Sequence, residues 1–339
     1  MNLKELSEHL SLSPTTVSRA LNGYPEVSEQ TRLRVTEAAK RLQYQPSQSA
    51  RRLATGRSNT IGHVIPRSQQ NILGPHFADI MAGVTDASSQ AGYESLLSIV
   101  EDDEEESFYR QMIASKRVDG VVLHGPRVND TRIELLIELE VPFVVHGRSD
   151  VAPEYAWMDV NNRRALQRAT EFLLDLGHQS IGFLNGTEHM FYAVRRRLGF
   201  EAAFAERGLT ADTSLMFSNE LTDSYGFEFT TALLNRKKPP TALVVSGILP
   251  AYGALRAATQ VGLRVPEDLS IITYDDQLSY LPNDGDIPLF TALRSSIRDA
   301  GKRVIELLVQ NIEMSDMTMT NELWEAELVV GRSTGRPAR

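Results

Sequence analysis

Small polar side chains and one arginine recur near the start of the chain at the spacing of one helical face. At about 100° per residue, Thr15, Arg19 and Asn22 fall on one side of a helix. Val17 and Ala20 fall on the opposite, apolar side. Side chains of the first kind reach base edges and phosphates in the DNA major groove, although an ordinary helical hairpin on a protein surface has the same pattern. The residues expected to contact DNA are Ser13, Pro14, Thr15, Thr16, Ser18, Arg19 and Asn22.

A second group of polar side chains follows apolar runs that are typical of buried strands. In an open α/β sheet the loops after the strands gather at one edge, and ligands bind there. Arg196 opens a helix that would face this edge, but Arg195–Arg197 could also be a solvated helix face. Likewise, Asp275 and Asp276 could simply cap a turn. The polar residues expected at the strand ends are Arg67, Ser68, His124, His146, Arg148, Asn185, Asp275 and Asp276.

Three short helices are expected to carry the first group. Asn2 and Ser28 stand at N-cap positions, and Ser13-Pro14 combines a capping hydroxyl with proline at the first helical position. Apolar residues at helical spacing predict an inward face on the first and third helices. These residues are Leu3, Leu6, Leu10, Val35, Ala38, Ala39 and Leu42.

Beyond Thr60 the chain alternates apolar strands with amphipathic helices, which predicts a parallel sheet covered on both faces. The alternation of strands and helices begins a second time near Arg163, so we expect two doubly wound lobes. Glu101–Glu106 is expected to be a solvated loop that enters a helix. Strands are expected at Thr60–Pro66, Glu94–Val100, Asp119–Leu123, Pro142–His146, Ser180–Asn185, Ala242–Ser246 and Ser270–Tyr274. Helices are expected at Pro75–Gly92, Thr131–Leu139, Arg163–Leu176, Phe191–Gly208, Ser224–Asn235, Pro250–Val261 and Ile297–Asn311.

Charge is divided unevenly along the 339 residues. The first 60 residues hold nine Lys and Arg against five Asp and Glu, a net of +4, so the remainder carries −13 of the total of −9. A basic head on an acidic body concentrates affinity for DNA in one place. The absence of cysteine excludes disulfides and thiolate metal sites. The absence of a signal peptide and of any apolar run of about 18 residues predicts a cytoplasmic protein without a membrane partner.

Three stretches in the first part of the chain read SPTTVSRALNG, VSEQTRLRVTEAAKRLQYQPS and ARRLATGRSNTIG. Together they resemble the headpiece and hinge of the LacI/GalR family of bacterial transcription regulators. Within that family, PFVVHGR, RSSIR and ELWEAELV are similar to repressors of α-glucoside uptake operons. The resemblance implies an all-α helix-turn-helix headpiece and an α/β body of two lobes like a periplasmic binding protein. Its partners would be pseudo-palindromic operator DNA and a small sugar.

The resemblance also implies how the chain is divided. It would cross between the lobes near Asn161, Leu293 and Asn321. The headpiece would span 1–46 and the hinge 47–59, the first lobe 60–160 and 294–320, and the second lobe 161–293 and 321–335. Because no leucine heptads precede the end of the chain, we expect a homodimer.

Ligand contacts are implied in the same way. Arg196 matches the arginine with which the family clamps sugars, and Asp275 in TYDD matches its carboxylate. His124 and Arg148 match polar contacts, and Phe77 and Phe290 would contact the sugar ring. One position departs from the pattern: relatives often carry Asn-Asp where this chain has Gly247-Ile248. A missing polar contact leaves room, which favours a larger ligand such as a disaccharide.

The hinge suggests a mechanism. Ser47–Leu53 is about two helical turns, too short to be stable alone in water. Paired with a second copy over DNA it could fold, with Ala50 and Leu53 on one face and Leu53 wedged between base steps. Arg51 and Arg52 would contact phosphates, whereas the alternative for Leu53 is packing against the first lobe. Closure of the sugar cleft would pull the hinges apart and lower operator affinity, unless the ligand acts as a corepressor.

Other function classes fit the sequence less well. Gly331–Gly335 spells G-x-S-x-G without a downstream histidine, and no dinucleotide, phosphate-loop or H-E-x-x-H motif occurs. We therefore expect no catalysis, no cofactor and no metal. A sugar-binding receptor without a regulatory role would share the fold but would not carry a headpiece. A nucleoid or architectural protein would not need an acidic body with a ligand cleft.

Overall fold

A computed structural model describes residues 2–44, 56–67, 74–151, 154–314 and 319–338. The chain forms two compact units, Met1–Asn59 and Thr60–Arg339. Six residues to which the sequence assigns DNA or ligand contacts lie outside the described residues: Ser47, Ala50, Arg51, Arg52, Leu53 and Ser68.

The first unit is a bundle of three helices, α1 (Leu3–Leu10), α2 (Pro14–Leu21) and α3 (Glu29–Arg41). The side chains of Asn2, Ser13 and Ser28 each accept a hydrogen bond from a backbone N–H of the first helical turn, which confirms the predicted caps. The predicted apolar faces also meet in one core. Its buried members are Leu6, Leu10, Val17, Ala20, Val27, Val35, Ala38 and Ala39.

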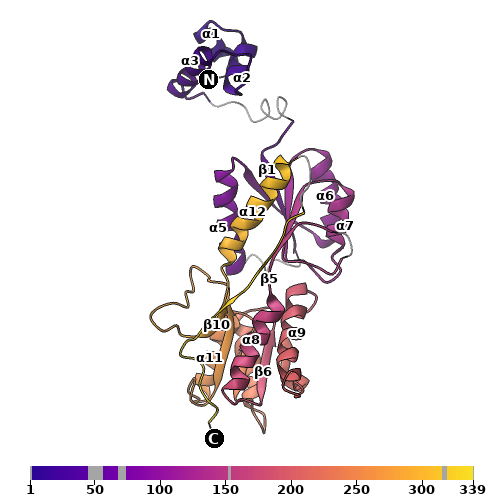
Figure 1. Cartoon of the computed structure of the whole chain (residues 1–339), viewed down its shortest axis with the longest axis vertical. Helices are drawn as coiled ribbons and strands as arrows, with labels where there is room; N and C mark the ends of the chain where they lie inside the picture. The colour runs from indigo at the N-terminus through magenta and orange to yellow at the C-terminus, as the bar shows by residue number, and fades with distance from the viewer. Residues whose placement is uncertain (1, 45–55, 68–73, 152–153, 315–318, 339) are drawn as a thin grey trace. The chain divides into compact units, whose positions relative to one another are not determined.

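The second unit contains two six-stranded sheets, each covered by helices on both faces, as the sequence predicted (Figure 1). The first sheet has the strand order β11-β5-β4-β3-β1-β2, and all its pairs are parallel. Its strands are β1 (Thr60–Pro66), β2 (Glu94–Val100), β3 (Gly120–His124), β4 (Phe143–His146), β5 (Trp157–Val160) and β11 (Asn321–Trp324). Helices α5 (Pro75–Gln90) and α12 (Ile297–Glu313) cover one face, and α6 (Glu105–Ala114) and α7 (Thr131–Glu138) cover the other.

Residues of each strand alternate between the two cores of this lobe. Ile61 and Ile65 of β1 pack with α5 and α12, and Val64 packs with α6 and α7. Side chains of a strand point alternately to the two faces of its sheet, and here both faces are buried. Because both faces are apolar, the sequence reads as a continuous hydrophobic run, which is why β1 was predictable.

The second sheet has the order β12-β10-β9-β8-β6-β7, with β12 antiparallel to β10. Its strands are β6 (Ile181–Asn185), β7 (Met216–Ser218), β8 (Ala242–Val245), β9 (Ser270–Asp275), β10 (Thr291–Arg294) and β12 (Glu327–Val329). Helices α8 (Asn162–Asp175) and α9 (Phe191–Ala205) cover one face, and α10 (Asp223–Leu234) and α11 (Ile248–Gln260) cover the other. None of the helices in the described ranges is long and apolar enough to cross a lipid bilayer.

The chain passes three times between the lobes. It leaves the first sheet after Val160, where we expected a crossing near Asn161, and returns between β10 and α12. The third crossing differs from the expectation near Asn321. Because β11 pairs with β5 and β12 pairs with β10, the chain crosses between Trp324 and Glu327.

Two glycines let the helix pairs approach closely at equivalent places in the lobes. A Cβ atom on Gly83 of α5 would lie 1.9 Å from the carbonyl oxygen of Arg298 in α12. A Cβ atom on Gly199 of α9 would lie 2.0 Å from the carbonyl oxygen of Arg163 in α8. The contact at Gly199 brings α8 against α9 one turn from Arg196 and so helps to position that side chain.

Candidate functional site

The polar face of α2 is exposed, and its apolar face is buried. Thr15, Arg19 and Asn22 face solvent, whereas Val17 and Ala20 are at most 2% exposed. The helix therefore presents the predicted set of short polar groups outward. This amphipathic arrangement is the geometry of a helix that can enter a DNA groove.

Some of the polar side chains of α2 form local hydrogen bonds. Ser13 Oγ accepts from the backbone N–H of Thr16 at 3.1 Å, and the two hydroxyls lie 2.8 Å apart. The Asn22 amide donates to the Ser18 carbonyl at 2.9 Å. Thr15 and Arg19 form no side-chain hydrogen bond within the described part of the first unit. They are the two side chains of α2 with the most freedom to contact a partner.

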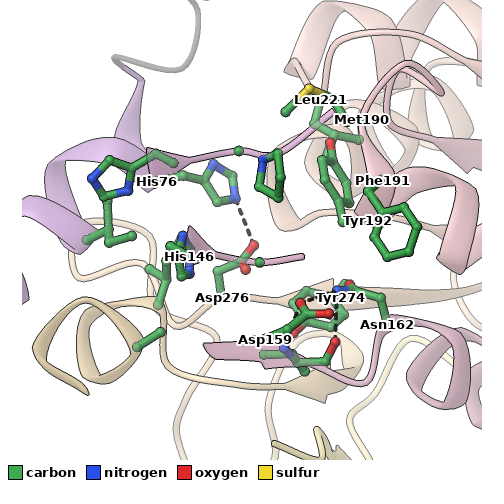
Figure 2. A pocket seen from close by; sticks show the side chains of 18 of the residues that line it. His76, His146, Asp159, Asn162, Met190, Phe191, Tyr192, Leu221, Tyr274 and Asp276 are labelled. Carbon is green, nitrogen blue, oxygen red and sulfur yellow. Dashed lines mark hydrogen bonds and ion pairs between the residues drawn. The ribbon is translucent and has the colours of Figure 1, made fainter. Parts of the chain in front are cut away.

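A cavity of about 330 Å³ lies between the two lobes of the second unit. Figure 2 shows His76, His146 and Asp276 on one side of it, Met190, Phe191, Tyr192 and Leu221 on a second, and Asp159, Asn162 and Tyr274 on a third. Both lobes thus supply polar groups and aromatic rings.

Arg196 is fixed in the cavity wall by four neighbours. Its Nε donates to Asn162 Oδ1 at 2.8 Å, and its Nη1 donates to the Ser246 carbonyl at 2.5 Å. The guanidinium also lies 4.9 Å from the ring centre of Tyr192 and 3.9 Å from that of Tyr274. Stacking on two rings and bonding to neutral acceptors holds a charged donor in one orientation before any ligand binds.

Two carboxylates of the cavity wall are paired with cations. Asp159 Oδ2 accepts from Arg148 Nε at 2.9 Å, and Asp276 Oδ2 lies 2.8 Å from His76 Nε2. Burial raises the pKa of Asp159 although Arg148 opposes the shift. Burial also acts to raise the pKa of Asp276, but attraction to His76 outweighs it and holds that pKa below its ordinary value.

Two histidines of the first lobe, His124 and His146, line the cavity and form its histidine floor, and His63 is buried beside His124. Nδ1 of His63 and Nε2 of His124 are 3.0 Å apart, and the rings of His124 and His146 meet edge to face at 6.0 Å. Burial lowers the pKa of His63 and of His146 to about 4 and that of His124 well below its ordinary value. The imidazoles are therefore neutral near pH 7. Nδ1 of His124 is buried and has no hydrogen-bond partner in the described structure.

Four of the ligand contacts that the family resemblance implied, Phe77, His124, Arg148 and Arg196, line this cavity. Two further residues expected at the strand ends, His146 and Asp276, also line it. Asp275 does not, although we expected the carboxylate there. Its side chain is 1% exposed and is held by Arg294 Nε at 3.2 Å, and the neighbouring Asp276 lines the cavity instead.

The other expected contacts also lie outside the cavity lining. Asn185 accepts from Ser246 Oγ at 2.9 Å and donates to the Ala193 carbonyl, so its amide is used within the second lobe. Phe290 is fully buried, with its ring edge to face against Tyr252. Arg67 forms an exposed ion pair with Glu101.

Gly247 lies beside an apolar side chain of the cavity wall. A Cβ atom there would lie 3.4 Å from Cδ1 of Leu221, so the Leu221 side chain occupies the adjacent space. Because Leu221 lines the cavity, the missing polar contact is replaced by an apolar surface.

Sequence reasoning missed several residues of the cavity. His76 follows Pro75 in the first turn of α5. The proline that starts this helix was the sequence signal that could have placed His76 at the helix N-terminus. Asp159 lies on β5, which is four residues long and was not predicted. Further lining residues that were not expected include Asn162, Met190, Phe191, Tyr192, Glu220, Leu221 and Tyr274. Within the described residues no group of three or more acidic or histidine side chains has the arrangement of a metal site.

Comparisons with known proteins agree with this architecture. Residues 3–47 match the family described as bacterial regulatory proteins, lacI family, and residues 170–334 match a periplasmic binding protein-like domain. The transcriptional regulator AglR of Rhizobium meliloti is 42% identical, with 99% of this chain and 94% of AglR covered. The regulator RafR of Escherichia coli is 30% identical, with full coverage of both chains.

Solved structures give the same result. The lac repressor dimer bound to operator and the anti-inducer ONPF superposes with a TM-score of 0.84 at 26% identity, covering 99% of each chain. A complex of the transcriptional regulator CelR with cellobiose superposes with a TM-score of 0.72 at 27% identity, covering 98% of this chain and 99% of CelR. The three-helix unit, the two-lobed body and the relatives along the whole chain establish that this protein belongs to the LacI family of transcription regulators.

Proposed function

We propose that this regulator is a repressor that binds a two-fold symmetric operator as a homodimer and responds to a saccharide held between its lobes. The observation that carries the proposal is the cavity, which joins a fixed arginine, two carboxylates and several aromatic rings. Arginine and carboxylate groups bind sugar hydroxyls, and aromatic rings cover the C–H face. A saccharide effector is supported by the structure of the similar CelR, which is a complex with cellobiose.

The DNA-binding part of the proposal rests on α2. Its exposed Thr15 and Arg19 would contact the major groove, together with Ser13, Pro14, Thr16, Ser18 and Asn22 at its edges. Two copies would present two such helices to half-sites related by a two-fold axis. The lac repressor structure, a dimer bound to operator, supports this assembly.

Regulation would act through lobe movement. Residues of both lobes line the cavity, so a ligand held there would contact both lobes and would change their relative position. In a dimer this change would separate the segments that precede the first lobes and would weaken their contact with the operator. A coupling of about 1–3 kcal/mol between two sites is typical.

A titration of operator binding with and without saccharides tests the proposal. We expect a saccharide such as maltose, sucrose or cellobiose to lower the affinity for operator several-fold. A ligand that raises the affinity would make the protein a corepressor-dependent regulator, the second candidate function. Lack of any response to saccharides, with retained operator binding, would contradict the sugar effector.

Catalysis is not part of the proposal. The carboxylates Asp159 and Asp276 are each paired with a cation, and Arg196 is bonded to neutral oxygens. The relatives are transcription regulators. The arrangement suits reversible binding, and incubation with a bound saccharide should return it unchanged.

A further inference from the structure

The charges around the cavity narrow the chemical class of the effector. We propose that the cavity takes an uncharged saccharide and rejects the phosphorylated form of the same sugar. The inference rests on the proposed function, because it concerns which saccharides the site accepts. The ligand would then be one that no phosphoryl-transfer step has modified.

The described residues that line the cavity carry equal numbers of positive and negative side chains. Three cationic groups, those of His76, Arg148 and Arg196, face three carboxylates. The carboxylates are those of Asp159, Glu220 and Asp276. The remaining imidazole at the rim, that of His189, is exposed to solvent. A neutral ligand leaves this balance intact, whereas an anionic ligand adds an uncompensated charge.

Two of the three cationic side chains already form ion pairs with carboxylates of the cavity wall. His76 is paired with Asp276 at 2.8 Å and Arg148 with Asp159 at 2.9 Å. Within the described residues Arg196 forms no ion pair, but two of its donors bond to protein oxygens and its face is stacked by tyrosines. One such guanidinium cannot neutralise a phosphate, which carries a charge of about −1.5 to −2 at pH 7.

The histidine floor cannot supply the missing charge. His124 and His146 are buried and neutral, since burial lowers their pKa. A neutral imidazole instead offers one donor and one acceptor, and the unpartnered Nδ1 of His124 suits a hydroxyl. The chemistry of the floor therefore matches a polyol better than an anion.

The carboxylates would also repel a phosphate directly. Asp276 and Asp159 belong to opposite lobes, so a ligand that fills the cavity meets at least one of them. Like charges brought together in a binding site discriminate strongly against the wrong ligand. By contrast, the same carboxylate oxygens accept hydrogen bonds from sugar hydroxyls.

Calorimetric titration of the full chain with matched pairs of ligands tests the inference. The probes are sucrose, maltose and trehalose, each beside its monophosphate at a 6-position. We expect the phosphate of whichever sugar binds to bind at least about 100-fold more weakly than the neutral sugar. The same order should appear in the concentration of each ligand that alters operator binding.

Two substitutions show whether the carboxylates cause the discrimination. Asp276→Asn and Asp159→Asn each remove a negative charge and free a cation, so each should reduce the ratio of the two affinities by about tenfold. Asp86→Asn is the matched control, because Asp86 lies on α5 in an exposed ion pair with Arg298 outside the cavity lining. The ratio of the affinities for the neutral and the phosphorylated sugar should be the same in Asp86→Asn as in the unmodified protein.

The possible results separate this inference from the proposed function. Equal or tighter binding of the phosphorylated sugar would overturn the inference and leave the saccharide effector standing. An unchanged ratio in both carboxylate variants would also overturn it, because the charges would not be the cause. Binding of neither form would overturn the saccharide effector and this inference together.

Discussion

Nε2 of His76 lies 2.8 Å from Oδ2 of Asp276, and this contact joins α5 of the first lobe to the end of β9 in the second. One turn further along α5, Asp79 accepts hydrogen bonds from the backbone N–H and the hydroxyl of Ser279, at 2.9 and 2.6 Å. Helix α5 therefore contacts one segment of the second lobe twice. These polar contacts stabilise the arrangement of lobes in which the cavity is formed.

On the other side of the cavity the lobes are joined by backbone hydrogen bonds. Val128 N–H donates to the His189 carbonyl at 3.0 Å, and Phe191 N–H donates to the Pro126 carbonyl at 3.1 Å. Pro126 and Phe191 both line the cavity. Hydrogen bonds therefore join the two lobes on both sides of the cavity.

The stability of the folded chain should depend on pH through His76. Burial acts to lower its pKa, but attraction and hydrogen bonding to Asp276 outweigh burial, and the pKa is raised above 6.5. Arg196 opposes this shift and Asp79 supports it. A raised folded-state pKa contributes stability that is fully present below about pH 6.5 and is lost as the pH rises through the folded-state value. The melting temperature should therefore fall as the pH rises from about 6.5 through the folded-state pKa of His76.

Thermal unfolding of His76→Gln measured at several pH values checks this dependence. Glutamine keeps a hydrogen-bond donor for Asp276 and cannot titrate in this range, so its pH profile should lack the fall seen with histidine. The exposed His9→Gln is the control, because His9 belongs to the first unit. A profile that is the same for His76→Gln and the unmodified chain would exclude His76 as the titrating group.

Arg196→Lys should abolish the response to saccharide and spare DNA binding. Lysine cannot bond to Asn162 and the Ser246 carbonyl while stacking between Tyr192 and Tyr274. Operator affinity with and without sugar measures both properties. Arg197→Lys is the matched control, because Arg197 pairs with Glu188 and Glu201 outside the cavity lining. Retained sugar response in Arg196→Lys would remove Arg196 from the proposed site.

Thr15→Ala should change which half-site is preferred. The Thr15 side chain is exposed and forms no hydrogen bond within the described first unit, so it is available to a base edge. Loss of one base contact should relax discrimination by about 1–3 kcal/mol at one position. Thr36→Ala on α3 is the control, since the Thr36 hydroxyl donates to the Arg32 carbonyl. Binding to a library of operator variants measures the preference, and equal preferences would contradict the α2 contact.

Gly199→Ala should destabilise the second lobe. The added Cβ would lie 2.0 Å from the Arg163 carbonyl oxygen, so α8 and α9 must separate. Overpacking of this kind costs about 1–3 kcal/mol or more in the free energy of unfolding. Gly247→Ala is the control, because its Cβ would meet Leu221 at an ordinary 3.4 Å. Urea denaturation compares the two, and a similar midpoint would show that the helices can move apart at little cost.

The local elements of the fold were predictable from the sequence because their signals are local. Ser13-Pro14 specifies the start of α2, and the capping hydrogen bond is present. The buried strand β1 begins and ends where its apolar run does, at Thr60 and Pro66. Fully buried strands need long apolar runs, so their pattern is strong. The family resemblance then supplied the pairing of lobes that no local signal contains.

Short and half-exposed strands were not predictable. Strands β5, β11 and β12 are three or four residues long, and two of them, β11 and β12, contain exposed residues. Such strands exist because a neighbouring strand offers hydrogen-bonding groups, as β5 does for β11. The third crossing between the lobes depends on these pairings, which is why its position differed from the expectation.

The sequence by itself determined the family, the exposed polar face of α2, the two-lobed body and the places where polar loops gather. Only the tertiary structure decided which side chain of each loop faces the cavity. In the TYDD stretch Arg294 holds Asp275 in the interior, and His76 from the other lobe holds Asp276 at the cavity. Adjacent residues have the same local sequence signal, so the choice between them depends on partners about 20 and 200 positions away along the chain.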